Sequence, residues 1–305
     1  MRPAPEERTV AELAAFGVVN LDKPAGPSAH QVAAWVRDRL DVDRAAHAGT
    51  LDPKVTGCLP TLTGDATRLA QVFLEGTKEY VAVLELHAPA PTDLERVIAE
   101  FEGDLYQKPP RKSAVTRRLR TREVSDLDVL DRTDRQVLLR IRCESGTYVR
   151  KLCHDIGLAL GTGGHMGHLR RTATDPFDDR DLHTLHDLID GVAFAEGEDA
   201  VGGRDTDAGA PDESLLREVL RPAEEALTGL PSLTIADSAA REVAEGAPVY
   251  APGVVAAGDT GSGAPAEGDL LACYTPDGAA VCLGRLVGDP DADAGEVVDL
   301  ERVLV

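Results

Sequence analysis

The chain has 305 residues, with 53 acidic and 32 basic side chains and a formal net charge of −21 at pH 7. This length allows one large domain or two with a buried core, and no apolar run approaches the roughly 18 residues of a membrane span. The net charge by itself argues against a nucleic-acid partner, because polyanions repel one another.

Other features of the composition bear on the compartment and the habitat. The first residues lack the basic-then-apolar order of a secretory signal, so we expect a cytoplasmic protein. The five cysteines form no C-x-x-C pair, which argues against a disulfide framework and a cysteine-based zinc site. Of the 32 basic residues, 26 are arginine. Together with the acidic excess this indicates adaptation to concentrated salt, although a base-composition bias of the genome would also favour arginine over lysine.

In chain order, the first predicted elements are a strand and a helix. Residues 16–22 are an apolar run that predicts a buried strand. Ser28 is predicted to cap a helix that runs to Leu40. Its apolar residues are expected on one face: Val32, Trp35, Val36 and Leu40. A loop over residues 47–60 follows, and residues 64–74 predict a second amphipathic helix.

Strands and helices then continue in mixed order. Residues 79–87 and 137–144 predict strands, the second with clean alternation of apolar residues. Thr92 and Glu95 have the spacing of a capping box that opens a helix. Residues 148–160 predict a further helix. This order predicts an α+β domain, a mixed sheet with flanking helices.

The amino-acid composition of the chain changes twice in its second half. Residues 195–213 carry seven acids against one arginine and predict an acidic, mobile insertion. After Pro231, short apolar runs alternate with Gly, Pro and Asp, which predicts a small all-β module. We therefore expect two domains, 1–227 and 228–305.

One segment reverses the charge of the chain. Seven basic residues and no acid occur in fifteen positions: Lys108, Arg111, Lys112, Arg117, Arg118, Arg120 and Arg122. One interpretation of such a charge run is a solvated surface without a binding role. In so acidic a chain it also suggests a phosphate-binding strip, since arginine forks make bidentate contacts with phosphate that survive high salt.

A second segment has the composition of a functional loop. Residues 47–57 read HAGTLDPKVTG, in which Asp52 precedes a proline that holds it extended, and two glycines allow close approach of a ligand or another backbone. Taken alone, an Asp-Pro between glycines is also the pattern of an ordinary turn.

These segments together resemble a known family. Five segments of the chain are similar to pseudouridine synthases: GVVNLDKPAGPSAHQVAAWVRDRL (17–40), HAGTLDPKVTGCLP (47–60), GTKEYVAVLELH (76–87), SGTYVRKLCHDIGLALG (145–161) and GGHMGHLRRT (163–172). The likeness is closest to the dyskerin type of archaea and eukaryotes, which includes the box H/ACA synthases; the bacterial tRNA pseudouridine-55 synthase is more distant. The tail from residue 230 resembles a PUA RNA-binding domain, with an expected all-β pseudobarrel.

The resemblance implies roles for individual residues. Asp52 matches the catalytic aspartate, Tyr80 the tyrosine that stacks on the target base, and Arg150 the arginine that pairs with the carboxylate. Leu169 matches the apolar residue that lines the pocket, and Lys23 a lysine that supports the active-site loop. We count these two with His47, at the start of the loop, among the pocket residues. The basic strip resembles the family's segment that closes on bound RNA.

The implied reaction is the isomerisation of uridine to pseudouridine in RNA. It breaks the N1–C1′ bond and joins C5 to C1′ without redox change or hydrolysis, so we expect neither a cofactor nor a metal. The ionised carboxylate acts either as nucleophile at the sugar or as base at C2′. The flipped base needs an aromatic or apolar clamp.

The resemblance leaves the substrate and the assembly open. The expected targets are tRNA uridine-55, rRNA sites selected by a box H/ACA guide RNA, or both, the latter in a ribonucleoprotein with small partner proteins. The alternative from another class is a non-catalytic RNA-binding scaffold that uses the basic strip and the PUA domain.

Overall fold

The computed structural model describes residues 1–109, 116, 118–197, 210–258 and 265–305. Within these ranges, ten strands form the larger sheet: β1 (Phe16–Lys23), β2 (Ala45–His47), β3 (Thr56–Gly64), β4 (Lys78–Leu86), β5 (Gly103–Gln107), β6 (Arg120–Arg132), β7 (Gln136–Cys143), β8 (Gly164–Thr174), β9 (Phe177–Asp178) and β10 (Arg221–Pro222). Their order is β10-β1-β3-β8-β4-β7-β6-β5, with β2 beside β3 and β9 beside β8. β3 and β8 are parallel and the other pairs antiparallel, so the sheet is mixed.

A second sheet comes from the end of the chain. In the described residues it contains β11 (Ser232–Ile235), β12 (Val249–Tyr250), β13 (Val254–Gly258), β14 (Leu270–Tyr274), β15 (Ala280–Leu286) and β16 (Glu296–Val303). Their order is β12-β16-β15-β14-β11-β13. The two sheets have separate strands, and the predicted fold class, a mixed α+β domain with a small all-β domain, is confirmed.

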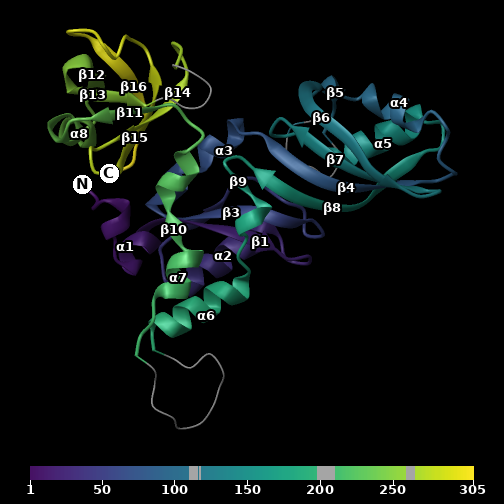
Figure 1. Ribbon diagram of the computed structural model, residues 1–305, viewed down its shortest axis with the longest axis horizontal. Helices are drawn as coiled ribbons and strands as arrows, with labels where there is room; N and C mark the ends of the chain where they lie inside the picture. Colours follow the sequence, from purple (N-terminus) through teal and green to yellow (C-terminus); the bar gives the residue numbers. More distant parts are fainter. Residues whose placement is uncertain (110–115, 117, 198–209, 259–264) are drawn as a thin grey trace.

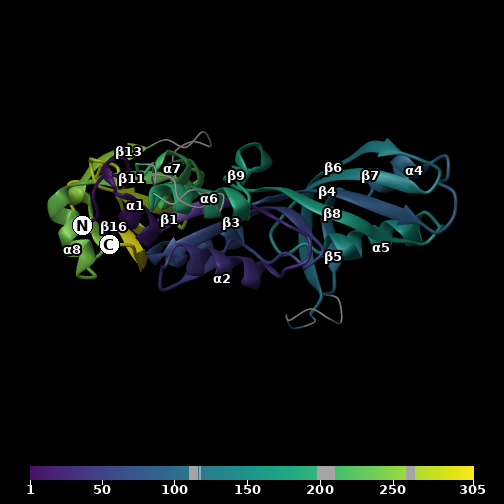
Figure 2. The ribbon, with the colours of Figure 1, turned by 90° about the horizontal axis from the view of Figure 1, so that it is seen from below.

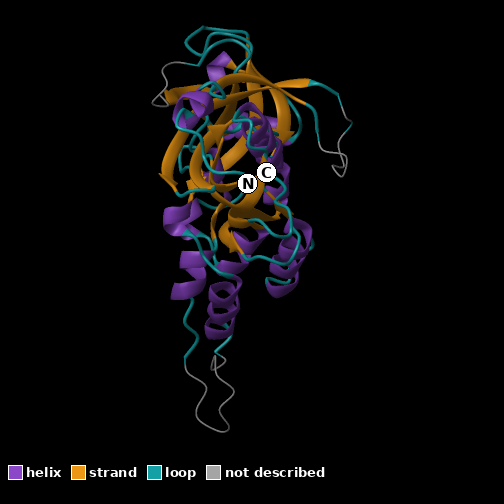
Figure 3. Ribbon diagram, turned by 90° about the vertical axis from the view of Figure 1, so that its right-hand side faces the viewer, coloured by secondary structure: helices purple, strands orange, loops and turns teal. Residues whose placement is uncertain are grey.

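The helices flank these sheets. They are α1 (Val10–Ala15), α2 (Ala29–Arg39), α3 (Val72–Glu75), α4 (Leu94–Ala99), α5 (Val149–Ala159), α6 (Leu185–Ala195), α7 (Ser214–Val219) and α8 (Asp237–Ala244). Short 3₁₀ turns are η1 (Pro5–Glu7), η2 (Asp65–Gln71), η3 (Asp179–Asp181), η4 (Ala223–Leu227) and η5 (Ala251–Gly253). Figure 3 shows helices gathered at one side of the strands, where α2, α6 and α7 lie in Figure 1. None of these helices is long and apolar enough to cross a membrane.

The molecule is elongated, with the all-β part at one end (Figure 2). A lobe of β4–β7 with α4 and α5 lies at the other end, and the long strands β4 and β8 join it to the centre (Figures 1 and 2). The all-β part is packed onto the centre through one shared apolar cluster, in which Phe16 and Leu62 of the larger sheet meet Ala272 and Leu283 of the smaller. β10 ends at Pro222 and β11 begins at Ser232, and the division into domains at 227/228 stays a prediction.

Several sequence predictions are confirmed by the structure. The strands expected over 16–22, 79–87 and 137–144 are β1, β4 and β7, and Ser28 caps α2 through a reciprocal pair of hydrogen bonds with Gln31. α5 begins after Tyr148, within the helix expected over 148–160. These segments fold as their apolar pattern and capping residues dictate.

Other predictions are wrong in detail. Trp35 is 47% exposed, because α2 buries the stripe Ala29, Val32, Ala33 and Val36 instead. α4 takes Asp93 as its N-cap, so the expected capping box of Thr92 does not form. The loop expected over 47–60 is shorter, since β2 ends at His47 and β3 begins at Thr56, and the helix expected over 64–74 is 3₁₀ in its first part. The acidic insertion expected at 195–213 lies mostly outside the described residues.

Candidate active site

The loop that carries Asp52 connects β2 to β3. Leu51 and Val55 are 4% exposed and pack in the apolar cluster beneath α2, on either side of the aspartate. The amide of Val55 donates to the Asp52 carbonyl at 2.9 Å, and that of Gly26 donates to the Pro53 carbonyl at 2.8 Å. Anchored at these points, the loop presents the Asp52 carboxylate outward, with half of its side chain exposed.

Arg150 reaches this carboxylate from another element. It is the second residue of α5, and its guanidinium forms an ion pair with Asp52. Both side chains are about half exposed, at 49% and 50%. Two residues far apart in sequence thus place a partly solvated carboxylate beside a guanidinium.

Lys23 holds the Asp52 loop from below. The residue is fully buried at the end of β1, and its ammonium group donates to the carbonyls of Pro24, Pro53 and Val55 at 2.9, 3.1 and 2.8 Å. Burial lowers its pKa. All three N–H groups are used on backbone oxygens, so the structure makes Lys23 a support of the loop and leaves it no direct contact with a substrate.

Tyr80 and Leu169 lie on neighbouring strands between two cores. Tyr80 is on β4 and Leu169 on β8, and both pack partly buried against the cluster beneath α2 and the cluster beneath α5. Burial raises the pKa of Tyr80, while the charge of Arg171 acts in the opposite direction. Such a pair supplies the aromatic and apolar surface that a flipped base requires.

His47 lies where β2 enters the loop. One ring nitrogen, Nε2, is 3.2 Å from Nδ1 of His30 on α2, and the other, Nδ1, is buried without a hydrogen-bond partner in the described structure. Burial lowers the pKa of His47, helped by the charges of His30 and Arg171. The ring thus lies against His30 of α2 in surroundings that favour its neutral form.

The basic strip is described only in part. Arg111, Lys112 and Arg117 lie outside the described residues. Lys108 and Arg118 are exposed, and Arg120 and Arg122 share one face of β6. The strip begins beside the site, because Gln107, just before Lys108, accepts a hydrogen bond from the Tyr148 amide at the start of α5 at 2.8 Å.

Sequence reasoning missed some charged residues around the loop. Arg171 of β8 is 1% exposed and bonded to two carbonyls of the loop region, and Arg170 forms a bidentate ion pair with Asp22 at 3.0 and 3.2 Å. The signal available was the alternation of β8, which puts Arg171 on the same face as Leu169.

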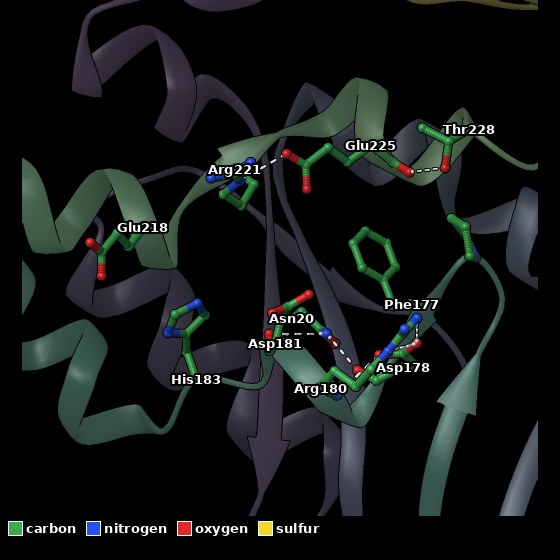
Figure 4. A pocket seen from close by; sticks show the side chains of 11 residues that line it. Asn20, Phe177, Asp178, Arg180, Asp181, His183, Glu218, Arg221, Glu225 and Thr228 are labelled. Carbon is green, nitrogen blue, oxygen red and sulfur yellow. Dashed lines mark hydrogen bonds and ion pairs between the residues drawn. The ribbon is translucent and has the colours of Figure 1, made fainter.

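A pocket of about 610 Å³ lies elsewhere, between the β9 turn and η4 (Figure 4). Phe177, Asp178, Arg180 and His183 line one wall, and Arg221 and Glu225 the other. None of the predicted catalytic residues lines it. Among the described residues, no group of three or more His, Cys, Asp or Glu side chains is arranged to hold a metal ion.

Four family models match the chain in succession. They are the DKCLD (NUC011) domain over residues 3–33, the N-terminal domain of TruB family pseudouridylate synthases over 37–149, the C-terminal domain of tRNA pseudouridylate synthase B over 150–228 and the PUA domain over 231–304. Lys23 falls in the first of these matches, Asp52 and Tyr80 in the second, and Arg150 in the third.

Whole proteins are similar along their full length. A protein of Halobacterium salinarum named "probable tRNA pseudouridine synthase B" is 68% identical, over 100% of this chain and 99% of that protein. One of Haloarcula marismortui with the same name is 62% identical, over 100% and 94%. Both relatives come from halophiles, in agreement with the salt adaptation predicted from the acidic composition.

Two solved structures match the fold of the whole chain. A structure of a Cbf5-Nop10-Gar1 complex matches with a TM-score of 0.88 and 42% identity, covering 100% of this chain and 89% of the other. A structure of an H/ACA RNP bound to a substrate RNA containing 2′-deoxyuridine matches with a TM-score of 0.87 and 40% identity, covering 99% and 89%.

Proposed function

Because the chain belongs to the TruB family of pseudouridylate synthases, it is a pseudouridine synthase, and we propose that Asp52, Arg150 and Tyr80 form its active site. The observation that carries this assignment is the ion pair of Asp52 and Arg150 at the loop held by Lys23. Residues 1–227 form the catalytic domain in this proposal, and residues 228–305 an RNA-binding domain.

Each residue has a part in the isomerisation. The Asp52 carboxylate acts at the ribose, either by attack on C1′ or by removal of a proton at C2′, while the N1–C1′ bond breaks. Arg150 pairs with the carboxylate and keeps it directed at the sugar. Tyr80 and Leu169 hold the freed uracil while it turns to present C5 to C1′. The C5 proton is then lost and N1 gains one, so atoms balance without a cofactor.

The RNA substrates and partners follow from the relatives. We propose tRNA uridine-55 as one target, since the similar proteins of Halobacterium salinarum and Haloarcula marismortui carry the name tRNA pseudouridine synthase B. We propose guide-directed rRNA sites as another, with Nop10- and Gar1-type partner proteins in the cytoplasm, since structures of such complexes match the whole chain. The basic strip would contact phosphates and the C-terminal domain the guide RNA.

A test of the site uses the full chain purified in molar potassium chloride. Asp52→Asn should bind a tRNA transcript as tightly as the wild type and form no pseudouridine, detected by nuclease digestion and mass spectrometry. Asp128→Asn is the matched control, because it removes an exposed aspartate–arginine pair (with Arg140, at 2.8 Å) in the outer lobe. Turnover by Asp52→Asn at the wild-type rate would refute the assignment of Asp52 as the catalytic carboxylate, whereas RNA binding without turnover by the wild type would favour the RNA-binding scaffold.

The same protein distinguishes the two kinds of target. RNA that copurifies with the protein from its own cells is sequenced after crosslinking. Guide-like hairpins among these reads support the ribonucleoprotein, and tRNA without any such hairpins would restrict the proposal to a standalone tRNA enzyme.

A further inference from the structure

Arg171 is an arginine in the interior of the protein. It is 1% exposed, and its charge is directed at backbone oxygens. Nε donates to the Cys58 carbonyl at 2.7 Å, and Nη2 donates to the Gly49 carbonyl at 3.3 Å. Burying a cation costs free energy unless several hydrogen bonds satisfy it, so a residue of this kind at a packing position would be unfavourable without another role.

The two carbonyls flank the Asp52 loop. Gly49 precedes the aspartate by three positions and Cys58 follows it by six, so one guanidinium bridges the two sides of the loop. Lys23 binds the middle of the same loop through Pro53 and Val55. The loop is thus fixed by two buried cations: Arg171 binds its two ends, and Lys23 binds its centre.

Both glycines of the loop motif lie against Arg171. At Gly49, whose φ is +95°, an added Cβ would lie 3.5 Å from Nη1 of the guanidinium. At Gly57, whose φ is +101°, it would lie 2.2 Å from the Arg171 carbonyl oxygen. The motif therefore leaves the side of the loop open where Arg171 packs.

Arg171 also faces the proposed base-binding tyrosine. In the sheet it is the register partner of Gly57 on β3 and of Tyr80 on β4. As register partners on one face of the sheet the two side chains are neighbours, and the charge of Arg171 acts against the burial that raises the pKa of Tyr80. The same residue consequently bonds to the loop of Asp52 and is the cross-strand neighbour of Tyr80.

We propose that Arg171 is a positioning residue that fixes the Asp52 loop and the Tyr80 phenol relative to each other. This inference rests on the proposed function, since it takes Asp52 and Tyr80 as the reacting and base-binding groups. Arg171 itself is shielded from the substrate and acts through these two residues. A displacement of about 1 Å between them is enough to lower the rate by about 10²-fold.

The test compares Arg171→Met and Arg171→Lys with Tyr80→Phe and with the double variant Arg171→Met/Tyr80→Phe. Single-turnover rates are measured with saturating tRNA in molar potassium chloride, and RNA affinity and the unfolding midpoint are measured alongside. Arg171→Met should lose about 10²-fold in rate with RNA affinity within twofold of the wild type. Arg171→Lys, which keeps the cation and one donor group, should recover part of this loss. Arg140→Met, on the exposed face of β7, is the control for removal of an arginine.

The double variant separates positioning from general packing. If Arg171 acts through Tyr80, its removal costs less in the Tyr80→Phe background than in the wild type. Equal losses in both backgrounds, or a wild-type rate for folded Arg171→Met, would overturn the inference. If Arg171→Met does not fold, the same cycle is run with Arg171→Lys, and equal losses again overturn it. Asp52→Asn is included throughout, because its activity, unlike these outcomes, would refute the proposed function itself.

Discussion

Arg8 and Glu224, 216 positions apart in sequence, form a buried bidentate ion pair with N–O distances of 2.8 and 2.7 Å. Arg8 is 1% exposed and Glu224 9%. The same carboxylate accepts a hydrogen bond from the Ala280 amide of β15 at 3.1 Å. One glutamate of η4 thus ties the N-terminal segment to the C-terminal β-domain.

Glu224→Gln should destabilise the protein by about 3–5 kcal/mol, because it leaves the Arg8 charge buried without its partner. Denaturant unfolding in molar potassium chloride measures the loss. Glu225→Gln, which breaks the exposed pair with Arg221 on the same segment, should cost less than about 1 kcal/mol. Equal costs for the two variants would show that the buried pair has no special weight.

Lys23→Met should destabilise the Asp52 loop, since it removes the ammonium group that donates to the carbonyls of Pro24, Pro53 and Val55. We expect a loss of at least about 1–3 kcal/mol in unfolding free energy together with loss of turnover. Lys54→Met, an exposed lysine of the same loop, should stay within about 0.5 kcal/mol of the wild type. A Lys23→Met protein with wild-type stability would contradict the support that the geometry shows.

Gly57→Ala and Gly103→Ala separate a backbone clash from backbone strain. Their φ angles are +101° and +100°, but a Cβ at Gly57 would lie 2.2 Å from the Arg171 carbonyl, whereas one at Gly103 meets nothing within 4 Å. Gly103→Ala should cost about 1–3 kcal/mol from φ alone. Gly57→Ala should cost at least about 1 kcal/mol more than Gly103→Ala in unfolding free energy, measured by thermal or denaturant unfolding. Similar losses for the two variants would show that the backbone relaxes to remove the clash.

The sequence predicts the framework of this molecule better than its buried electrostatics. Strands 16–22 and 137–144 and the Ser28 cap follow from local pattern and capping chemistry, which act over a few residues. Trp35 was assigned to the buried face, but the burial of α2 is decided by the elements packed on it, so the stripe shifted to Ala29 and Ala33. Alternation along β8 places Arg171 on the face of Leu169, but the contacts of Arg171 and the Arg8–Glu224 pair could not be predicted, because the partners are distant in sequence and an isolated arginine has the pattern of a surface residue.

Lys78 should make stability depend on pH. Its ammonium group is buried and donates to the carbonyls of Phe73 and Gly76, both at 2.8 Å, and burial lowers its pKa to about 8. In the unfolded chain the pKa is about 10.4, so between these values the unfolded state binds a proton that the folded state lacks. The contribution of Lys78 to stability therefore rises as the pH increases through this window. The difference in unfolding free energy between the wild type and Lys78→Met should grow from pH 8 to about pH 10, and a difference independent of pH would show that Lys78 titrates normally.

The exposed cations of the strip should contribute to RNA binding by direct contact even in concentrated salt. At 1 M salt the Debye length is about 3 Å, so long-range attraction is screened while a bidentate or contact pair persists. Lys108→Ala and Arg118→Ala should each weaken tRNA binding and lower the slope of log Kd against log salt by about 1, as expected for one lost phosphate contact. Arg140→Ala, an exposed arginine of β7 paired with Asp128, is the control and should leave the slope unchanged. Because the chain carries a net charge of −21, a loss of affinity confined to low salt would instead mean that the strip acts only by offsetting the acidic surface.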